Sequence, residues 1–233
     1  MVKIPQGIVK NLPDFRAFSK HVLYQKNMTP KSFSAELRSI KKDYMLANER
    51  KLFCQRADIL AEQLESARNQ NFAGIVYSLL AKITEHFPKE LEYYAYKGYK
   101  TAQRNGDAIH MLARLNDIRK IVYCQSSRLH DYVNILFEQE RCLKTITSSY
   151  DNVVKNFQTI SRPPAPKKDY ETMLAYIQTE LSKLIWKKEP ELALKKLKSA
   201  QDIFRHLGDK GNKEYITLLM CRIKANSRFE NFA

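Results

Sequence analysis

The sequence is poor in the residues that interrupt regular structure or build catalytic loops. It has only six glycines in 233 residues, and they form no glycine-rich phosphate-binding motif. No run of about 18 uncharged apolar residues occurs, so we do not expect a membrane-spanning helix. With 44% hydrophobic residues, the chain can still bury a sizeable core. These features indicate a folded protein that is neither loop-dominated nor disordered.

The cysteines and histidines are too scattered to suggest a metal or catalytic site. Metal clips need ligands at short, fixed spacings, which the four cysteines lack. These are Cys54, Cys124, Cys142 and Cys221. No two of the five histidines lie four residues apart, no nucleophile motif occurs, and carboxylates such as Glu138 and Glu140 are expected on solvated polar faces. We therefore expect buried reduced thiols, no metal, no cofactor and no enzymatic activity.

The formal net charge of +15 is large for this length, and the excess lies in residues 1–60 and 181–233. Such a charge attracts nucleic acid, an acidic membrane surface or an acidic protein partner, and it would serve solubility equally well. Because the chain shows no apolar core of a signal peptide and no disulfide framework, we expect a cytoplasmic location. No feature of the sequence indicates whether the protein forms homo-oligomers.

Apolar residues recur at steps of three and four through most of the chain, which predicts an all-α fold of roughly eight to ten helices. The clearest stretch is residues 168–233, where three such stripes predict three helices. Pro190 can start the second of them, and Gly208 marks its end. The stripes are Tyr170, Leu174, Ile177, Leu181 and Leu184; Ala193, Leu197, Ala200, Phe204 and Leu207; and Ile216, Leu219, Met220 and Ile223.

The middle of the chain carries equally clear signals for helix ends. A helix over 72–87 is expected to end at Pro88, and another follows over 89–104. Asn105-Gly106 then forms a turn, after which Asp107 caps a helix that reaches about Tyr123.

A heptad-like apolar seam occupies residues 127–160, with one polar break at Gln139. Threonines and serines near its middle weaken helix propensity, so two consecutive helices are the alternative, and a coiled-coil dimer is another. Three prolines make residues 161–167 an extended linker. The predicted organisation is an N-terminal arm and short helix (1–28), a helical-hairpin domain (29–160), this linker (161–167) and a C-terminal three-helix unit (168–233).

Two stretches resemble the tetratricopeptide-repeat family. Ala193, Leu197 and Ala200 have the spacing of that family's second helix, where small residues let paired helices approach closely. Val76, Leu80, Ile83, Pro88 and Gly98 match a second stretch. Two features depart from the family pattern. Leu181 stands where a glycine is usual, and the turn at Asn105-Gly106 is longer than the pattern by one residue. The resemblance covers at most 55–123 and 168–225. It implies stacked antiparallel helical hairpins, a TPR-like α-solenoid, whose first helices line an interaction groove.

Two groups of residues could bind a partner. On helix 89–104, basic and aromatic residues share one flank, which suits acidic side chains or phosphates. They are Tyr93, Tyr96, Lys97, Lys100 and Arg104. The alternative is a half-buried tyrosine cluster covered by lysine stems. A secondary basic patch, near one helix turn, comprises Lys183, Lys187, Lys188, Lys195, Lys196 and Lys198. Part of it can pair with neighbouring carboxylates as a solvated face.

The function expected from these features is that of a non-enzymatic helical-repeat adaptor. It would bind a protein partner, with an acidic segment as the favoured ligand, through the basic-aromatic face of helix 89–104. The alternative is a basic helical module that binds RNA or DNA through phosphate contacts. Salt dependence separates the two, since binding through phosphates weakens steeply as ionic strength rises.

Overall fold

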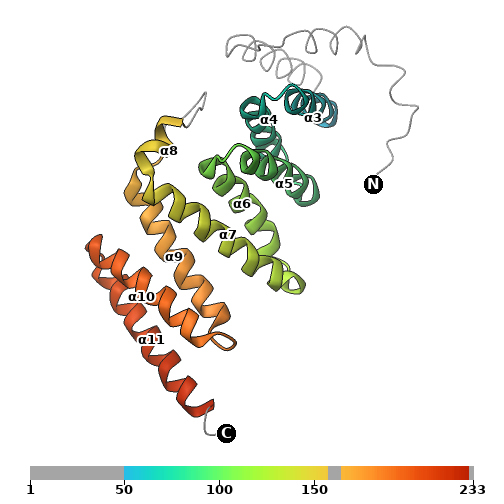
Figure 1. Cartoon of the computed structure of the whole chain (residues 1–233). Helices are drawn as coiled ribbons and strands as arrows, with labels where there is room; N and C mark the ends of the chain where they lie inside the picture. Colours follow the sequence, from blue (N-terminus) through green and yellow to red (C-terminus); the bar gives the residue numbers. More distant parts are fainter. Residues whose placement is uncertain (1–49, 157–163, 231–233) are drawn as a thin grey trace, which may run out of the picture. The chain divides into compact units, whose positions relative to one another are not determined.

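The computed structural model describes residues 50–156 and 164–230, in which all regular structure is helical (Figure 1). These residues form nine α-helices, one short 3-10 helix and no strand, which confirms the all-α prediction for them. The elements are α3 (Arg50–Ser66), α4 (Gln70–Ile83), α5 (Pro88–Arg104), α6 (Ala108–Tyr123), η2 (Ser126–Arg128), α7 (Leu129–Ser148), α8 (Tyr150–Asn156), α9 (Lys167–Ile185), α10 (Pro190–His206) and α11 (Lys210–Glu230). The predicted arm at 1–28 lies outside the described residues, as do residues 161–163 of the predicted linker.

The chain divides into two compact units, Met1–Val76 and Tyr77–Ala233, with the boundary inside α4. The described part of the first unit is α3 and the start of α4. A stripe on α3 is fully buried and includes Leu60 and Leu64. The turn that follows contains Arg68 at φ 60°, and the next amide, that of Asn69, donates to the carbonyl oxygen of Leu64 at 2.8 Å. This closes the helix with a left-handed residue that is not glycine.

In the second unit, proline and aspartate begin helices as expected. Pro88 and Pro190 occupy the first turns of α5 and α10, where a missing N–H costs no hydrogen bond. Asp107 caps α6, because its carboxylate accepts a hydrogen bond from the amide of His110 at 3.0 Å. Gly106 and Gly208 adopt φ values of +66° and +75° in the turns after α5 and α10.

Helix α4 ends at Ile83, four residues before the predicted end at 87. The following turn is tightened by Thr84, whose hydroxyl donates to the carbonyl oxygen of Leu80 at 2.8 Å. The amide of Phe87 then donates to the carbonyl oxygen of Thr84 at 2.8 Å. Phe87 itself has φ −123° and ψ 87°, since a residue before proline is kept out of the helical region.

The seam of residues 127–160 contains a helix break. Helix α7 ends at Ser148, Ser149 has φ −129° and ψ 35°, and the short α8 follows. This matches the alternative of two consecutive helices that the hydroxyl-rich middle suggested. Gln139, the polar break in the seam, is fully buried and donates to the side-chain oxygen of Asn116 at 2.6 Å. This hydrogen bond satisfies the amide nitrogen of Gln139, whereas its amide oxygen is buried without a hydrogen-bond partner.

The helices of the second unit pack in chain order: α5 on α6, α6 on α7, α7 on α9, α9 on α10, and α10 on α11 (Figure 1). Helix α9 joins two parts of the core. Leu174 and Leu181 belong to a cluster shared with α5, α6 and α7, whereas Ala175 and Ile185 belong to one shared with α10 and α11. Helices α7 and α9 therefore pack together although the proline-rich stretch lies between them in sequence.

Small residues let α9 and α10 approach closely. Ala193 and Ala200 are both 0% exposed, as the sequence stripe predicts. Ser182 on α9 reaches across and donates to the carbonyl oxygen of Ala193 at 3.0 Å. Leu184, predicted to share the apolar stripe of α9, instead remains 37% exposed near the end of the helix. None of the described helices is apolar over enough length to cross a bilayer.

Candidate functional site

A pocket of about 430 Å³ opens between α5 and α7, over a floor formed partly by α6. We call it the tyrosine pocket. Two of the predicted site residues, Tyr93 and Tyr96, line it. Its other lining residues are Glu92, Tyr99, Leu115, Ile118, Arg128, Asp131, Asn134, Ile135 and Glu138. The described part of the chain thus combines aromatic, apolar and charged side chains in one hollow.

The aromatic wall comes from the periodicity of α5. Tyr96 and Tyr99 lie three residues apart on the side of the helix that faces α7, with Tyr93 one turn earlier. Tyr93 and Tyr96 are 50% and 54% exposed, whereas Tyr99 is only 7% exposed because it packs into the core. Half-exposed tyrosines over an apolar floor are typical anchor residues of interfaces.

The charged end of the pocket is organised around Arg128, at the start of α7. Its Nη2 lies 2.7 Å from an oxygen of Glu92 on α5, and its Nε donates to Asp131 at 2.8 Å. Hydrogen bonds to these two carboxylates raise the pKa of the Arg128 guanidinium. One cation therefore sits between two acids and ties α5 to α7.

A second link between these helices involves Glu138. Its carboxylate accepts from the hydroxyl of Tyr99 at 3.3 Å and from Nη2 of Arg141 at 2.6 Å. Burial, reinforced by the nearby Glu138, raises the pKa of the Tyr99 phenol to about 12. The phenol therefore stays protonated and can donate at any physiological pH.

The basic residues predicted on α5 lie beside the tyrosine pocket and not in its lining. The ammonium of Lys97 is 4.7 Å from the ring centre of Tyr93, and that of Lys100 is 5.5 Å from the ring centre of Tyr96. Lys100 also donates to Gln103 at 3.3 Å. Arg104 is exposed at the end of the helix. Lysine ammonium groups and tyrosine rings are thus in contact along the edge of the pocket formed by α5, and both kinds of side chain are partly exposed.

The lysines of the secondary basic patch have different surroundings. Lys183 lies 5.0 Å from the ring centre of Tyr215 and lines a pocket with α11, whereas Lys195 lines a different pocket between α7 and α10. Lys187 lies 5.7 Å from the Trp186 ring centre. The exposed members of the predicted patch are Lys183, Lys187, Lys188, Lys195 and Lys198.

Lys196 requires a correction, because it is a core residue and not part of an exposed patch. It is only 8% exposed, and its ammonium pairs with Glu140 of α7 and lies 4.8 Å from the ring centre of Phe137. The signal was present in the sequence: Lys196 lies three residues after Ala193 and four before Ala200, within the buried stripe of α10.

Glu140 also differs from its predicted place on a solvated face, since it is only 4% exposed. It accepts hydrogen bonds from Lys196, from Lys144 at 2.8 Å and from Gln178 at 3.2 Å. Burial alone would raise its pKa, but these hydrogen bonds outweigh burial and hold the pKa below the ordinary value. The ionised carboxylate therefore joins α7, α9 and α10.

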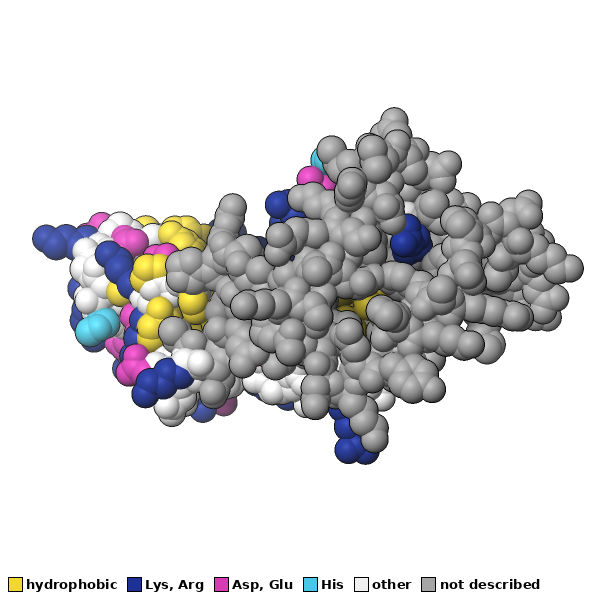
Figure 2. Space-filling model, turned by 90° about the horizontal axis from the view of Figure 1, so that it is seen from above, with side chains coloured by type: hydrophobic (Ala, Val, Ile, Leu, Met, Phe, Trp, Pro, Cys, Tyr) yellow, Lys and Arg dark blue, Asp and Glu magenta, His cyan; other side chains and the backbone are white. Residues whose placement is uncertain are grey.

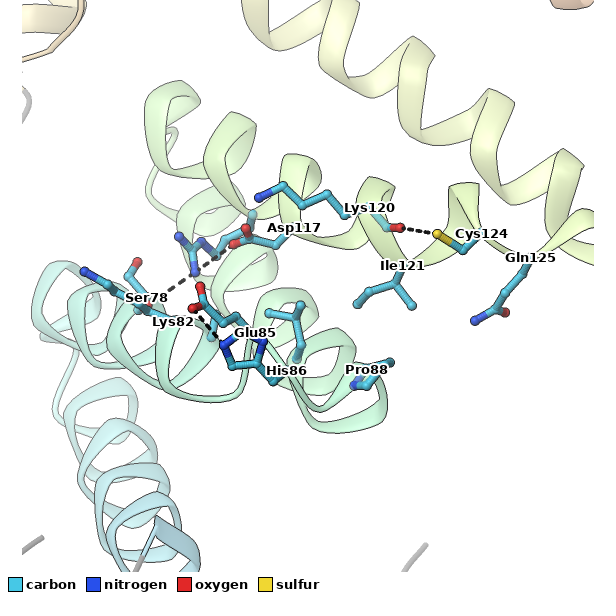
Figure 3. A pocket seen from close by; sticks show the side chains of 13 residues that line it. Ser78, Lys82, Glu85, His86, Pro88, Asp117, Lys120, Ile121, Cys124 and Gln125 are labelled. Carbon is cyan, nitrogen blue, oxygen red and sulfur yellow. Dashed lines mark hydrogen bonds and ion pairs between the residues drawn. The ribbon is translucent and has the colours of Figure 1, made fainter.

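A larger pocket, of about 690 Å³, lies between the end of α4, the start of α5 and α6. Figure 3 shows Lys82 and Ser78 at the end where Asp117 lies, with Pro88 and Ile121 toward the other end. Arg114, which also lines this pocket, pairs with Asp117 at 3.1 Å. Gln125 and Cys124 also lie at the end with Pro88 and Ile121, so that end mixes apolar and polar side chains (Figure 3).

Gly98 explains how Arg114 reaches this position. A Cβ at Gly98 would lie 3.0 Å from Cδ of Arg114 and 3.1 Å from Cβ of Tyr77. Only glycine leaves room for the arginine stem to cross α5 without displacing a neighbour. The glycine singled out by the sequence resemblance thus has a local packing role here.

The cysteines do not form a site. None of the four is in a disulfide, but only Cys54 and Cys142 are buried, so the expectation of buried thiols is wrong for Cys124 and Cys221. Burial, with a contribution from Glu138, raises the pKa of Cys142 to about 11. Among the described residues, no group of three or more histidine, cysteine or acidic side chains could hold a metal ion.

In the part of the face in Figure 2 that the structure describes, basic, acidic and hydrophobic side chains are intermixed. Tyr93 and Tyr96 were predicted from the sequence, whereas the charged residues of the pocket were not. A spacing signal existed, because Arg128, Asp131, Ile135 and Glu138 recur at steps of three and four along α7.

Comparison with protein-family models and with curated proteins gives no match for this chain.

Proposed function

We propose that the protein is a non-enzymatic, cytoplasmic adaptor that binds a segment of a partner protein along α5, at the tyrosine pocket. The observation that carries the proposal is the pair of half-exposed tyrosines, Tyr93 and Tyr96, over an apolar floor. Large rigid rings that remain exposed beside a preformed hollow offer contact area at low entropic cost. Lys97, Lys100 and Arg104 border the same wall, where acidic residues of the partner would pair with them.

We also propose that α5 to α11 form a tetratricopeptide-like stack of helical hairpins. Two side-chain links support this arrangement, since α5 is tied to α7 by Glu92 and Arg128, and α7 to α10 by Glu140 and Lys196. Contacts between alternate helices are what a stack of hairpins requires. In this arrangement α5, α7 and α10 lie on the same side of the stack, as first helices of successive hairpins. The sequence resemblance differs at α10, because it placed Ala193 and Ala200 in a second helix.

The test is photo-crosslinking from the full-length chain in cell lysate. Benzoylphenylalanine in place of Tyr96 should crosslink one protein, whereas the same residue in place of Tyr176, which is 50% exposed on α9, should not. Charge reversal by Lys97→Glu with Lys100→Glu should abolish the crosslink while leaving thermal unfolding within a few degrees. The matched control is Lys210→Glu with Lys224→Glu, which makes the same charge change at exposed positions outside both predicted binding groups.

Two outcomes would reject the proposal. Equal crosslinking from positions 96 and 176, or equal crosslinking by the two charge-reversed proteins, would show that this face is not the binding site. Loss of the crosslinked species after nuclease treatment, with binding that weakens steeply in salt, would favour the alternative of a nucleic-acid-binding module.

A further inference from the structure

We propose that the tyrosine pocket receives a basic side chain of the partner, an arginine or a lysine. The inference rests on the proposed function and specifies the chemistry of the residue that enters the pocket. It also separates two parts of the same face: the lysines at the edge of α5, which suit acidic residues, and the pocket itself.

The charges that line the pocket are predominantly negative. Three lining residues are acids, and Arg128 is the only base among the lining residues. Glu92 and Asp131 share that single cation. Their side chains are 33% and 48% exposed, so both carboxylates retain surface that a ligand can reach. Glu138 pairs instead with Arg141 outside the lining. The group formed by Glu92, Arg128 and Asp131 therefore has an excess of one negative charge, which a basic residue of a partner would neutralise.

The aromatic wall favours a cation as well. Ammonium groups of this chain already lie against the outer tyrosine rings, 4.7 Å from the centre of Tyr93 and 5.5 Å from that of Tyr96. The negative faces of such rings attract cations by about 0.5–1 kcal/mol at exposed sites and more where water is excluded. Lys97 and Lys100 already occupy these rings, so a cation supplied by a partner would have to displace them.

The floor suits the stem of such a side chain. Leu115 and Ile118 are 4% and 8% exposed, and Ile135 is partly buried beside them. Lysine and arginine bury their methylene groups on apolar surface while the charged group remains among polar atoms. A pocket of about 430 Å³ has room for one such side chain.

Arg128 shows how a guanidinium is held in this place. It contacts Glu92 through Nη2 at 2.7 Å and Asp131 through Nε at 2.8 Å, which is a charge-assisted pair of bonds. A carboxylate offers about four acceptor positions, so neither acid is saturated by Arg128. Glu138, which accepts from Tyr99 and Arg141, supplies a third acceptor group at the opposite end of the pocket.

The experiment is an NMR titration of the full-length protein with three acetylated, amidated pentapeptides. These are identical except at the centre, which carries arginine, its neutral isostere citrulline, or glutamate. The protein carries ring-labelled tyrosine, and Tyr93→Phe and Tyr96→Phe variants assign the two signals of interest. The arginine peptide should shift both signals, and the citrulline peptide should bind about tenfold more weakly, since it lacks the charge.

Variants of the pocket acids complete the test. Asp131→Asn and Glu138→Gln should each weaken the arginine peptide several-fold and leave the citrulline peptide unchanged. The control is Glu189→Gln, an exposed carboxylate far along the chain, which should change neither affinity. Circular dichroism of each variant checks that the helices are retained.

Any of three results would overturn the inference. Equal binding of the arginine and citrulline peptides would show that charge is not recognised. Tighter binding of the glutamate peptide would show that the pocket takes an acid. No shift at Tyr93 or Tyr96 with any peptide would show that no such side chain enters. In each case a specific crosslink from position 96 would leave the adaptor proposal standing.

Discussion

Glu138 and Glu140 lie two residues apart on α7 and have opposite environments. The Glu138 side chain is 38% exposed, lines the tyrosine pocket and pairs with the exposed Arg141. The Glu140 side chain is 5% exposed and pairs with the buried Lys196. Two residues correspond to about 200° around a helix, so the two carboxylates point to opposite sides of α7. The comparison shows that one helix can carry a half-exposed carboxylate and a buried ion pair within a single turn.

The two pairs should differ in what they contribute. An exposed pair is weakened by solvent and by the entropy of its side chains, so it contributes about 0–1 kcal/mol to folding. A buried pair gains little over an apolar replacement, but removal of one partner leaves a buried charge without compensation. Stability should therefore depend on Lys196 and Glu140, and ligand recognition on Glu138.

The largest effect is expected for Lys196→Met. The substitution preserves the length of the stem but leaves Glu140 buried with only Lys144 and Gln178 as partners. We expect the free energy of unfolding in urea to fall by about 3 kcal/mol. Lys195→Met, at the exposed neighbouring position, should change it by less than about 0.5 kcal/mol. Similar losses for the two variants would mean that burial does not distinguish these lysines.

The pH dependence of stability tests the same pair from the acid side. The pKa of Glu140 is held below its ordinary value, so its contribution is fully present above the unfolded pKa of about 4.3 and is lost as pH falls through the lower folded pKa. Glu140→Gln should therefore be less stable than the natural protein at pH 7, and the difference should shrink toward pH 3. Urea unfolding across this range measures it, and a difference independent of pH would contradict the assignment.

The Arg114–Asp117 pair lies between the two extremes, with side chains 12% and 22% exposed. Gly98→Ala tests it, because the new Cβ would press on the arginine stem at 3.0 Å. Crowding of this kind costs about 1–3 kcal/mol, of which the better helix propensity of alanine returns about 1 kcal/mol. We expect a net loss of about 1 kcal/mol in thermal or urea unfolding. Gly211→Ala, whose Cβ has no neighbour closer than 3.9 Å, should cause no loss.

Local signals in the sequence predicted most of the helices and their ends. Proline at the start of α5 and α10, the aspartate cap of α6, and the buried alanines of α10 all follow from residues within one helix. Each of these features depends on backbone hydrogen bonds or on one helical face, which spacing alone defines. This is why the second unit could be outlined without knowledge of its packing.

The charged residues could not be placed in the same way. Glu140 is buried because α9 and α10 cover that side of α7, and its partner Lys196 is 56 residues away in sequence. The tyrosine pocket likewise draws Tyr93 from α5 and Asp131 from α7. Periodicity describes one helix at a time, so it cannot say which of two polar sides will meet another helix.

The smallest effect is expected for Glu138→Gln. Its partner Arg141 is 60% exposed and remains hydrated when the carboxylate is lost, and glutamine can still accept from the hydroxyl of Tyr99. The free energy of unfolding should change by less than about 1 kcal/mol, against the larger loss for Glu140→Gln at pH 7. Urea unfolding of the two variants side by side measures this. Because the two substitutions are chemically identical and two residues apart, a difference between them reports the burial of the two carboxylates and the partners that they contact. Equal losses would mean that Glu138 supports the fold. The effect of Glu138→Gln on peptide binding could then not be separated from its effect on stability.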